Sequence, residues 1–495
     1  MKRSIAHMMA ASLAVAPLAM ADWQFRSRPD LAPPRLNITI PATDKVEQGP
    51  YIFRDNGDLV WSGYGLYSIW ATNFQAGRWK GKDILFSFEG DHNAGYGHGH
   101  GHITIVDQHY ETIRELRAGN HKLVDKHEFH IVNEETGLIQ IYQPVPRDLQ
   151  KWGASPEQQW IVNAIIQELD IATGKLLFEW SSLDHVQPDE AVLPINPGQA
   201  GSGYNSSDAW DYFHINSVDK DAEGNYLISA RDACAIHKIN GTDGSIIWRL
   251  HGKRSDFSVP DDAKFCFQHH ARWLSQEGDV EVISLSYGAY EQWQDSPAQH
   301  NLVDSRAGCG LLPPDDLLSK SQGSTQVLPG GNVLVNWGSE GALTEFTADG
   351  TPIFHAYVDS GFLGVGAENY RAFRYNWTGI PNETPAIVAL QGKEGTKVYV
   401  SWNGDTETAF WRFYAVTDEY GSRDFLGEVK RTSFETSLVT SKNIASVAAE
   451  AVDVHGRVIG STASVFVEAE VLPTQLDNAK GQKPLGRYNA LGADL

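Results

Sequence analysis

Short runs of alternating hydrophobic and polar positions, each ended by a turn, repeat along most of the chain. One form pairs two extended segments across a Thr-Gly or Asp-Gly turn and ends in an aromatic residue. Its copies span 166–180, 235–248 and 343–354. A second form places an acidic or glycine-rich turn before a β-rich run. Its copies span 134–142, 221–229 and 328–336. The two forms alternate, which is typical of successive β-propeller blades, although a large β-sandwich or barrel is also compatible with the pattern.

The repeating pattern stops at residues 375–385, where the chain reads YNWTGIPNETP. Two prolines interrupt the alternation, so we place a domain boundary in this segment. Short β-rich runs follow at the spacing of a sandwich, over 398–402, 409–415, 446–454 and 462–468. They predict a small fibronectin- or immunoglobulin-like module over 381–470 and a polar tail over 471–495. Helical periodicity is limited to single turns near 188–192 and 315–319, so we expect an all-β protein.

The first 21 residues have the pattern of a signal peptide. Basic residues at positions 2 and 3 precede an apolar run over 8–20, and alanines at 19 and 21 suit cleavage near Asp22. The run is shorter than a membrane span, and no other stretch reaches about 18 apolar residues. We therefore expect a protein that is secreted or resides in the lumen of the secretory pathway, with a propeller and N-terminal arm over 22–380.

Composition and charge narrow the class of protein. The chain has 495 residues, which is long enough for two domains. Its composition, 41% hydrophobic and 21% charged residues, is ordinary for a globular protein. The formal net charge is −22. Because phosphate binding requires a basic surface, this charge argues against a nucleic-acid partner, and an acidic surface has no attraction for anionic lipid.

Sequons and cysteines agree with the secretory route. Asn-x-Ser/Thr sequons predict N-glycosylation of a eukaryotic protein at Asn37, Asn205, Asn240, Asn376 and Asn382. The cysteines are Cys234, Cys266 and Cys309, so at most one disulfide forms and the pairing is open. No two of them have CxxC spacing, which argues against a structural zinc site.

Four short clusters bring histidine or arginine to the ends of predicted strands. They read DKHEFH at 125–130, WDYFHINS at 210–217, SAR at 229–231 and FCFQHHAR at 265–272. Imidazole is a nucleophile near neutral pH, and arginine stabilises developing negative charge. Several such groups in one chain therefore indicate an enzyme more than a plain binding protein.

In this order, the motifs HEF, FHINS, SxR and FxxQHxAR resemble the arylsulfotransferase-like propeller family, particularly its secreted fungal branch. The sequence YVSWNG at 399–404 is also similar to that branch, and the resemblance covers most of residues 45–470. It implies a six-bladed propeller whose central funnel holds the active site.

The resemblance also implies roles for four residues. In sulfotransferring members one histidine is transiently sulfated, and its position matches His269. The positions that bind the sulfuryl oxygens match His127, His214 and Arg231. His127 is preferred to His130 because the motif places the histidine before glutamate, which leaves His130 a structural role. No cofactor is implied.

The chain departs from its relatives around this predicted site. His270 follows His269 where relatives usually carry aspartate, and the next strand, 284–290, differs from theirs. These departures predict a funnel with more imidazoles and fewer carboxylates. We expect Trp210, Tyr287 and His270 to contact the substrate.

The tract His98-Gly-His100-Gly-His102 resembles a metal-binding sequence. Alternate residues of a strand share one face, so we interpret the tract as a blade edge that faces solvent or the funnel. No metal site is predicted.

Three functions are compatible with these residues. We favour a cofactor-free cyclase that couples a phenol- or tropolone-type quinone methide with a terpene by a hetero-Diels–Alder reaction, as in fungal meroterpenoid biosynthesis. This choice rests on resemblance to the branch and on the aromatic richness of the chain. The alternative is transfer of sulfate between phenols without the nucleotide donor PAPS. The third function is non-catalytic ligand binding.

Overall fold

A computed structural model describes most of the chain between residues 18 and 469. The described residues are 18–27, 49–67, 70–93, 97–195, 200–277, 280–287, 301–302, 310–311, 314, 317, 319, 321–357, 365–417 and 421–469. In this part of the chain strands dominate, and the single α-helix is the four-residue α1 (Ser182–His185). No helix among these residues is long and apolar enough to cross a membrane. The predicted tail over 471–495 lies outside the described residues.

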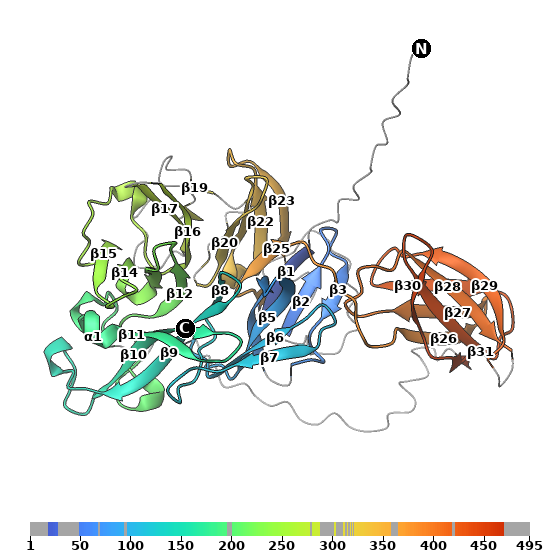
Figure 1. Cartoon of the computed structure of the whole chain (residues 1–495), viewed down its shortest axis with the longest axis horizontal. Helices are drawn as coiled ribbons and strands as arrows, with labels where there is room; N and C mark the ends of the chain where they lie inside the picture. Colours follow the sequence, from blue (N-terminus) through green and yellow to red (C-terminus); the bar gives the residue numbers. More distant parts are fainter. Residues whose placement is uncertain are drawn as a thin grey trace, which may run out of the picture.

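Six blades of antiparallel strands are arranged in a ring (Figure 1). Four of them are complete blades of four consecutive strands: β4 (Trp70–Trp79), β5 (Lys82–Gly90), β6 (Gly101–Val106) and β7 (Thr112–Leu116); β8 (Phe129–Val132), β9 (Thr136–Pro146), β10 (Trp160–Asp170) and β11 (Leu176–Ser181); β12 (Ile215–Lys220), β13 (Tyr226–Ala230), β14 (Ala235–Ile239) and β15 (Ile246–His251); β20 (Ser324–Val327), β21 (Val333–Asn336), β22 (Ala342–Phe346) and β23 (Pro352–Tyr357). The fifth blade contains β16 (Gln268–Glu277) and β17 (Val280–Tyr287), beside the short pair β18 (Asn301–Leu302) and β19 (Gly310–Leu311).

The sixth blade joins the two ends of the propeller. It combines β25 (Ala372–Tyr375), and β24 (Val365–Glu368) at its edge, with β1 (Leu18–Ser27), β2 (Gly49–Phe53) and β3 (Leu59–Ser62). β1 pairs with β2 on one side and β25 on the other, which closes the ring. Residues 18–21 pair with β25 and also belong to the predicted signal peptide, so cleavage near Asp22 would remove this pairing. The remainder of that peptide, 1–17, lies outside the described residues.

The repeating pattern of the sequence corresponds to the blades. The first form falls on the last two strands of a blade, β10–β11, β14–β15 and β22–β23, and the second form on the turn into the second strand. Gly174, Gly244 and Gly350 occupy the tight turns of the first form with φ of 74°, 75° and 86°, a conformation that favours glycine. The predicted propeller is therefore confirmed, and a single sandwich or barrel is excluded for this region.

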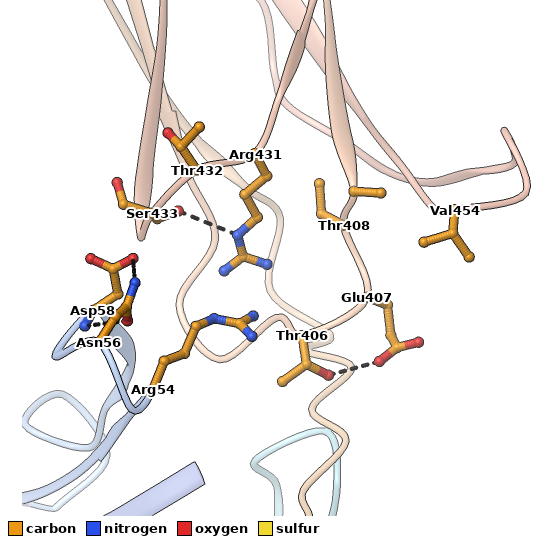
Figure 2. A pocket seen from close by; sticks show the side chains of 11 residues that line it. Arg54, Asn56, Asp58, Thr406, Glu407, Thr408, Arg431, Thr432, Ser433 and Val454 are labelled. Carbon is orange, nitrogen blue, oxygen red and sulfur yellow. Dashed lines mark hydrogen bonds between the residues drawn. The ribbon is translucent and has the colours of Figure 1, made fainter. Parts of the chain in front are cut away.

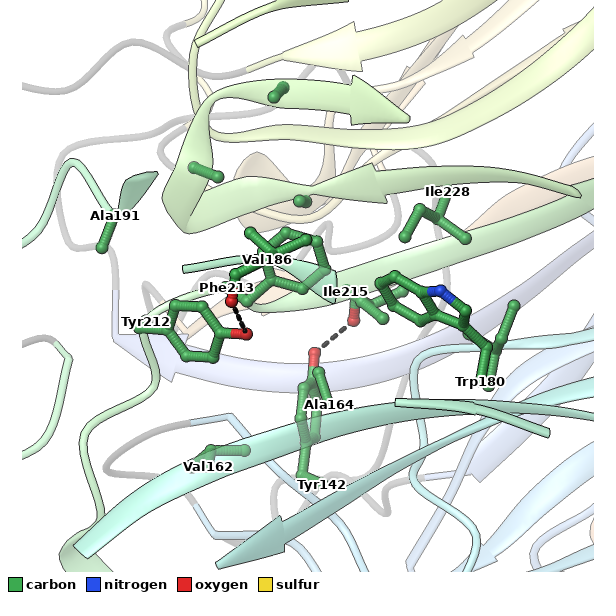
Figure 3. Packing of buried hydrophobic residues seen from close by; sticks show 14 of the residues in the cluster. Tyr142, Val162, Ala164, Trp180, Val186, Ala191, Tyr212, Phe213, Ile215 and Ile228 are labelled. Atoms are coloured by element: carbon green, nitrogen blue, oxygen red, sulfur yellow. Dashed lines mark hydrogen bonds between the residues drawn. The ribbon is translucent and has the colours of Figure 1, made fainter. Parts of the chain in front are cut away.

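Hydrophobic side chains fill the space between neighbouring blades. Figure 3 shows Trp180, Tyr212 and Phe213 packed together in the largest cluster, between the blades β8–β11 and β12–β15. The Trp180 indole donates to the Gly244 carbonyl at 3.0 Å, and the Tyr212 hydroxyl donates to the Val186 carbonyl at 3.2 Å. The polar tips of these rings are thus satisfied while their apolar bodies are buried.

A buried ion-pair network, here called the Glu128 hub, connects the inner strands. Glu128 precedes β8 and accepts from Arg272 of β16 at 2.7 Å and from Arg371, next to β25, at 2.9 Å. It also accepts the backbone N–H of Val218 in β12 at 3.1 Å. Burial alone would raise the pKa of Glu128, but the two guanidinium groups lower it, so the carboxylate is ionised.

Arg371 extends the Glu128 hub to another blade. Its side chain is fully buried and donates to the Asn73 amide oxygen of β4 at 3.0 Å and to the Asn216 carbonyl at 2.8 Å. Five of the six blades therefore contribute to one polar network. Isolated buried charges are costly, so this arrangement fixes the blades relative to one another only while the pairs are complete.

A β-sandwich follows the propeller. β25 ends at Tyr375 and β26 begins at Ala386, on either side of the interrupted segment. The two sheets are built from β26 (Ala386–Gly392), β27 (Gly395–Ser401), β30 (Glu435–Thr440) and β34 (Glu468–Ala469), and from β28 (Phe410–Val416), β29 (Arg423–Lys430), β31 (Ser446–Val452), β32 (Val458–Ser461) and β33 (Val465–Phe466). The Asn403 side chain bonds both backbone groups of Ser62, at 2.8 and 2.9 Å, which attaches the module to the sixth blade.

A pocket of about 340 Å³ lies between the β2–β3 turn and the module (Figure 2). Arg54 enters it from the propeller and Arg431 from the module. Arg431 donates to Asp405 at 2.6 Å and to the Ser433 carbonyl at 3.3 Å, so this guanidinium is already held within the module.

Candidate active site

Three imidazoles and one guanidinium come together at the ends of inner strands from three blades. His127 precedes β8, His214 precedes β12, Arg231 follows β13, and His269 lies in β16. The rings of His127 and His214 have centroids 5.0 Å apart. The pKa of His269 is lowered by burial and by the charges of these three neighbours. The structure thus brings together the four residues to which the sequence assigned catalysis.

The three histidines are almost completely buried. Their exposed fractions are 3% for His127, 8% for His214 and 3% for His269, whereas the Arg231 side chain is 19% exposed. Imidazoles in such an environment are sheltered from water, which strengthens their electrostatic interactions with a bound anion.

Asp125 orients His127. Its carboxylate lies 2.5 Å from Nδ1 and also accepts the backbone N–H of His127 at 2.9 Å. Burial lowers the pKa of His127 to about 3 in spite of this carboxylate, and the interaction holds the pKa of Asp125 below its usual range. The imidazole is therefore neutral, with its proton on Nδ1 and a lone pair on Nε2.

Asp211 orients His214 in the same way. Its Oδ2 lies 2.6 Å from Nδ1 of His214, and its Oδ1 accepts the backbone N–H at 3.0 Å. Both carboxylates were visible in the sequence, two and three residues before their histidines. Asp125, Asp211 and Asp232 are all buried beside the imidazoles. The expectation of fewer carboxylates than in relatives stays a prediction.

His269 has a carbonyl partner instead of a carboxylate. Its Nδ1 lies 3.1 Å from the Phe267 carbonyl oxygen. Because a carbonyl only accepts, Nδ1 carries the proton and Nε2 has a free lone pair. Burial and Arg231 keep the pKa of His269 well below its usual value, so this nitrogen is unprotonated at neutral pH. The backbone thus orients the ring of His269.

The turn that carries Arg231 is fixed to the strand that carries His269. Arg231 donates to Asp232 at 2.6 Å and lies over the Phe267 ring at 4.7 Å. The Gln268 amide donates to the carbonyls on both sides of this turn, at 3.0 Å each. Cys234 and Cys266 form a disulfide across the same junction, which resolves the pairing that the sequence left open. Cys309 lies outside the described residues.

The residues predicted to contact substrate make hydrogen bonds or strand pairs within the protein. Trp210 is 2% exposed, and its indole donates to the Leu193 carbonyl at 3.3 Å within the hydrophobic core. His270 accepts the N–H of Thr325 at 3.4 Å, and the backbone of Tyr287 pairs with the strand of His269. The described contacts do not test a role in binding, which stays a prediction.

The described sequons lie in loops and turns. Asn205, Asn376 and Asn382 are exposed and Asn240 is half-buried, while Asn37 lies outside the described residues. Glycosylation at these five positions stays a prediction. His130, to which the sequence gave a structural role, has its Nε2 3.3 Å from Asp219 within the propeller.

The histidine tract that leads into β6 contributes one residue to the site and others to the blade edge. His98 stacks on Tyr142 with centroids 4.2 Å apart, and its Nε2 lies 2.7 Å from Oδ2 of Asp211. His100 is exposed, and His102 lies 3.6 Å from Glu89. The sequence predicted a blade edge but did not assign His98 to the site. Its position depends on a loop path that periodicity does not encode.

Donor atoms of His98, Asp211 and His214 all lie within 4.8 Å, as in a metal site. However, one Asp211 oxygen is 2.7 Å from one imidazole nitrogen and 2.6 Å from the other, which are hydrogen-bond lengths. Two donors on one tetrahedral zinc lie about 3.3 Å apart, given bonds of about 2.0–2.1 Å. We interpret the group as a hydrogen-bonded triad.

The fold and this cluster define a six-bladed propeller protein with a buried histidine–arginine site at the inner ends of its blades. Residues 75–359, more than half of the chain and all four clustered residues, match the family model described as arylsulfotransferase (ASST). The chain belongs to this family. A comparison with curated proteins found no match.

Solved structures show only distant similarity. A protein of unknown function from Bacteroides caccae has a TM-score of 0.37 at 9% identity, covering 73% of this chain and 99% of its own. The GH43 protein BlXynB from Bacillus licheniformis has a TM-score of 0.30 at 9% identity, covering 80% and 89%. Apo AztD from Citrobacter koseri has a TM-score of 0.26 at 9% identity, covering 87% and 100%. The fold assignment rests on sheet topology, since these scores are too low to inform it.

Proposed function

We propose that this protein transfers a sulfuryl group from an aryl sulfate to a phenol through a sulfated His269, without a nucleotide donor. The observation that supports this most directly is the state of His269: a buried, neutral imidazole with its proton held on Nδ1 by a carbonyl. Such a ring offers Nε2 as a nucleophile. Arg231 and two further imidazoles lie within electrostatic range of it.

In the first half-reaction, Nε2 of His269 attacks the sulfur of the aryl sulfate. The N–S bond forms, the S–O(aryl) bond breaks, and the phenolate leaves with the bonding electron pair and takes a proton from water. Arg231 and His214 bind the sulfuryl oxygens and stabilise their charge in the transition state. The Nδ1–H bond to Phe267 keeps the sulfated ring in place.

In the second half-reaction, the oxygen of an acceptor phenol attacks the same sulfur, and the N–S bond breaks. The phenolic proton passes to Nε2 of His127, which is unprotonated because the pKa of His127 is lowered to about 3. Asp125, 2.5 Å from Nδ1, stabilises the imidazolium that forms. The proton then leaves to water, and His269 is restored.

The test is a turnover assay with purified protein, an aryl sulfate donor and a phenol acceptor. The proposal predicts release of the donor phenol together with formation of the acceptor sulfate. His269→Ala abolishes both products, whereas His100→Ala, a substitution of an exposed histidine, leaves both rates unchanged. Transfer that survives in His269→Ala would contradict the proposal, as would its absence in the natural protein.

Cyclisation, the function favoured by the sequence, is the second candidate. Aromatic rings support it: Tyr142 and Tyr370 lie 5.6 and 5.5 Å from the His127 ring. Such rings can order a quinone methide and a terpene while imidazole donors polarise a conjugated carbonyl. If the purified protein couples these partners and transfers no sulfate, cyclisation is its function and sulfotransfer is not. Failure of both assays would support ligand binding. Secretion and glycosylation remain part of the proposal in each case.

A further inference from the structure

His98 shares the carboxylate that orients His214. Nε2 of His98 donates to Oδ2 of Asp211 at 2.7 Å, and Nδ1 of His214 donates to the same oxygen at 2.6 Å. The ring centroids of the two histidines are 5.8 Å apart. An oxygen that accepts from two rings is held on both sides, so Asp211 cannot rotate without breaking one of these bonds.

The loop that carries His98 reaches both orienting carboxylates of the site. The backbone N–H of Gly99, the next residue, donates to Oδ1 of Asp125 at 2.7 Å. The His98 ring itself is stacked on Tyr142, with 29° between the planes, and its side chain is only 13% exposed. One short loop therefore donates hydrogen bonds to Asp125, the partner of His127, and to Asp211, the partner of His214.

We propose that His98 is a positioning residue, which holds Asp211 so that His214 presents Nε2 to the transferring group. This inference rests on the proposed function for its catalytic consequence. It does not require His98 to contact substrate. Partners that orient a functional imidazole typically contribute about 10- to 100-fold to activity in metal sites, where the same arrangement recurs.

The charge of His98 adds a second consequence. Asp211, Asp125, Lys126, His214 and Tyr142 surround the ring. Burial lowers the pKa of His98, but the bond and charge of Asp211 outweigh burial and raise it. As pH rises through this raised pKa, the positive charge is lost while the neutral ring still donates from Nε2. Charge and hydrogen bond can therefore be tested separately.

Three variants make this separation: His98→Ala, His98→Gln and His100→Gln. Alanine removes both bond and charge, glutamine restores an amide donor without charge, and His100 is an exposed control from the same tract. We expect kcat/KM to fall about 10- to 100-fold in His98→Ala and to recover in large part in His98→Gln. The wild-type rate should decline in part as His98 loses its charge at higher pH. This decline should be absent in His98→Gln, which has no charge at this position at any pH, and should persist in His100→Gln. Equal activity and equal profiles in all three variants would overturn the proposal.

A second measurement does not depend on sulfotransfer. Diethyl pyrocarbonate modifies an accessible imidazole nitrogen, so its rate of reaction with His214 at a fixed pH, followed by peptide mass spectrometry, reports how the His214 ring is presented. Because His98 and His214 share one oxygen of Asp211, this rate should change in His98→Ala, return in large part in His98→Gln and stay unchanged in His100→Gln. An unchanged rate in His98→Ala would contradict the role of His98. Absence of sulfate transfer in the natural protein would instead contradict the proposed function.

Discussion

The imidazole cluster and the Glu128 hub lie next to each other in sequence and differ in how their charges are arranged. In the hub, one carboxylate lies between two guanidinium groups, and opposite charges meet directly. In the cluster, imidazoles and a guanidinium gather, and carboxylates contact only one side of His127 and His214. In the hub each charge meets an opposite charge, whereas the cluster places the Arg231 guanidinium beside the unprotonated Nε2 atoms of His127 and His269.

The same motifs supply both regions. In HEF, His127 belongs to the cluster and Glu128 to the hub; in QHxAR, His269 belongs to the cluster and Arg272 to the hub. Neighbouring residues of one motif therefore belong to two separate networks. Substitutions in the cluster should lower activity, and substitutions in the Glu128 hub should lower the stability of the fold.

Replacing the nucleophile has the largest expected effect. His269→Ala should reduce aryl sulfate transfer by about 10⁴-fold or more, as removal of a covalent nucleophile does in other enzymes. Thermal unfolding should change little in comparison with Glu128 variants. Measuring kcat and the unfolding midpoint on the same preparation checks both statements, and a large loss of stability with modest loss of activity would reverse the assignment.

Breaking the hub should act on stability. Glu128→Gln leaves the buried Arg371 without its carboxylate, and loss of one partner of a buried pair costs about 3–5 kcal/mol. Denaturant unfolding measures this loss, with Glu115→Gln as a control because that carboxylate pairs with Arg117 at the surface. Equal unfolding free energies for the two variants would show that the hub does not fix the blades.

Removing an orienting carboxylate should act on activity. In Asp125→Asn the new amide can donate to Nδ1 of His127, which moves the ring proton to Nε2 and removes the base. We expect kcat to fall about 10²- to 10⁴-fold, which is the usual contribution of general acid–base catalysis. Stability should fall less than in Glu128→Gln. A loss of activity that is recovered by adding exogenous imidazole base would further support the role of His127.

Low pH should reduce the free energy of unfolding, because the folded protein keeps His127 neutral. The folded pKa of His127 is about 3 against 6.5 for a free histidine, so the unfolded chain binds the proton first as pH falls. The free energy of unfolding should fall below pH 6.5, by at most about 1.4 kcal/mol per pH unit from this residue. Between about pH 6.5 and 4.5, carboxylates in the unfolded chain remain largely ionised, so histidines dominate the slope. His127→Gln should reduce this slope, and His100→Gln should leave it unchanged.

The sequence predicted much of the fold because blades are local. Turn glycines such as Gly174 and Gly244 and the alternation on each side of them depend only on neighbouring residues. The four catalytic candidates were predicted through motif order. Closure of the ring by residues 18–27 was missed, because pairing between the two ends of a propeller leaves no local pattern.

The site was less predictable where contacts are long-range. Asp211 lies 113 residues from His98, and Arg371 lies 243 residues from Glu128. Neither separation in sequence is one from which a contact can be predicted. The sequence singled out His269, but the partner of its ring, the Phe267 carbonyl, is a backbone feature that residue identity does not reveal.

The proposed reaction requires that His269 itself carries the sulfuryl group. The direct measurement mixes the protein with excess aryl sulfate in the absence of acceptor, quenches the reaction and identifies modified peptides by mass spectrometry. We expect release of one phenol per protein molecule in a burst, with one sulfuryl group on His269 that disappears when a phenol is added. Phenol release without modification of His269, or a sulfuryl group on another residue, would contradict it.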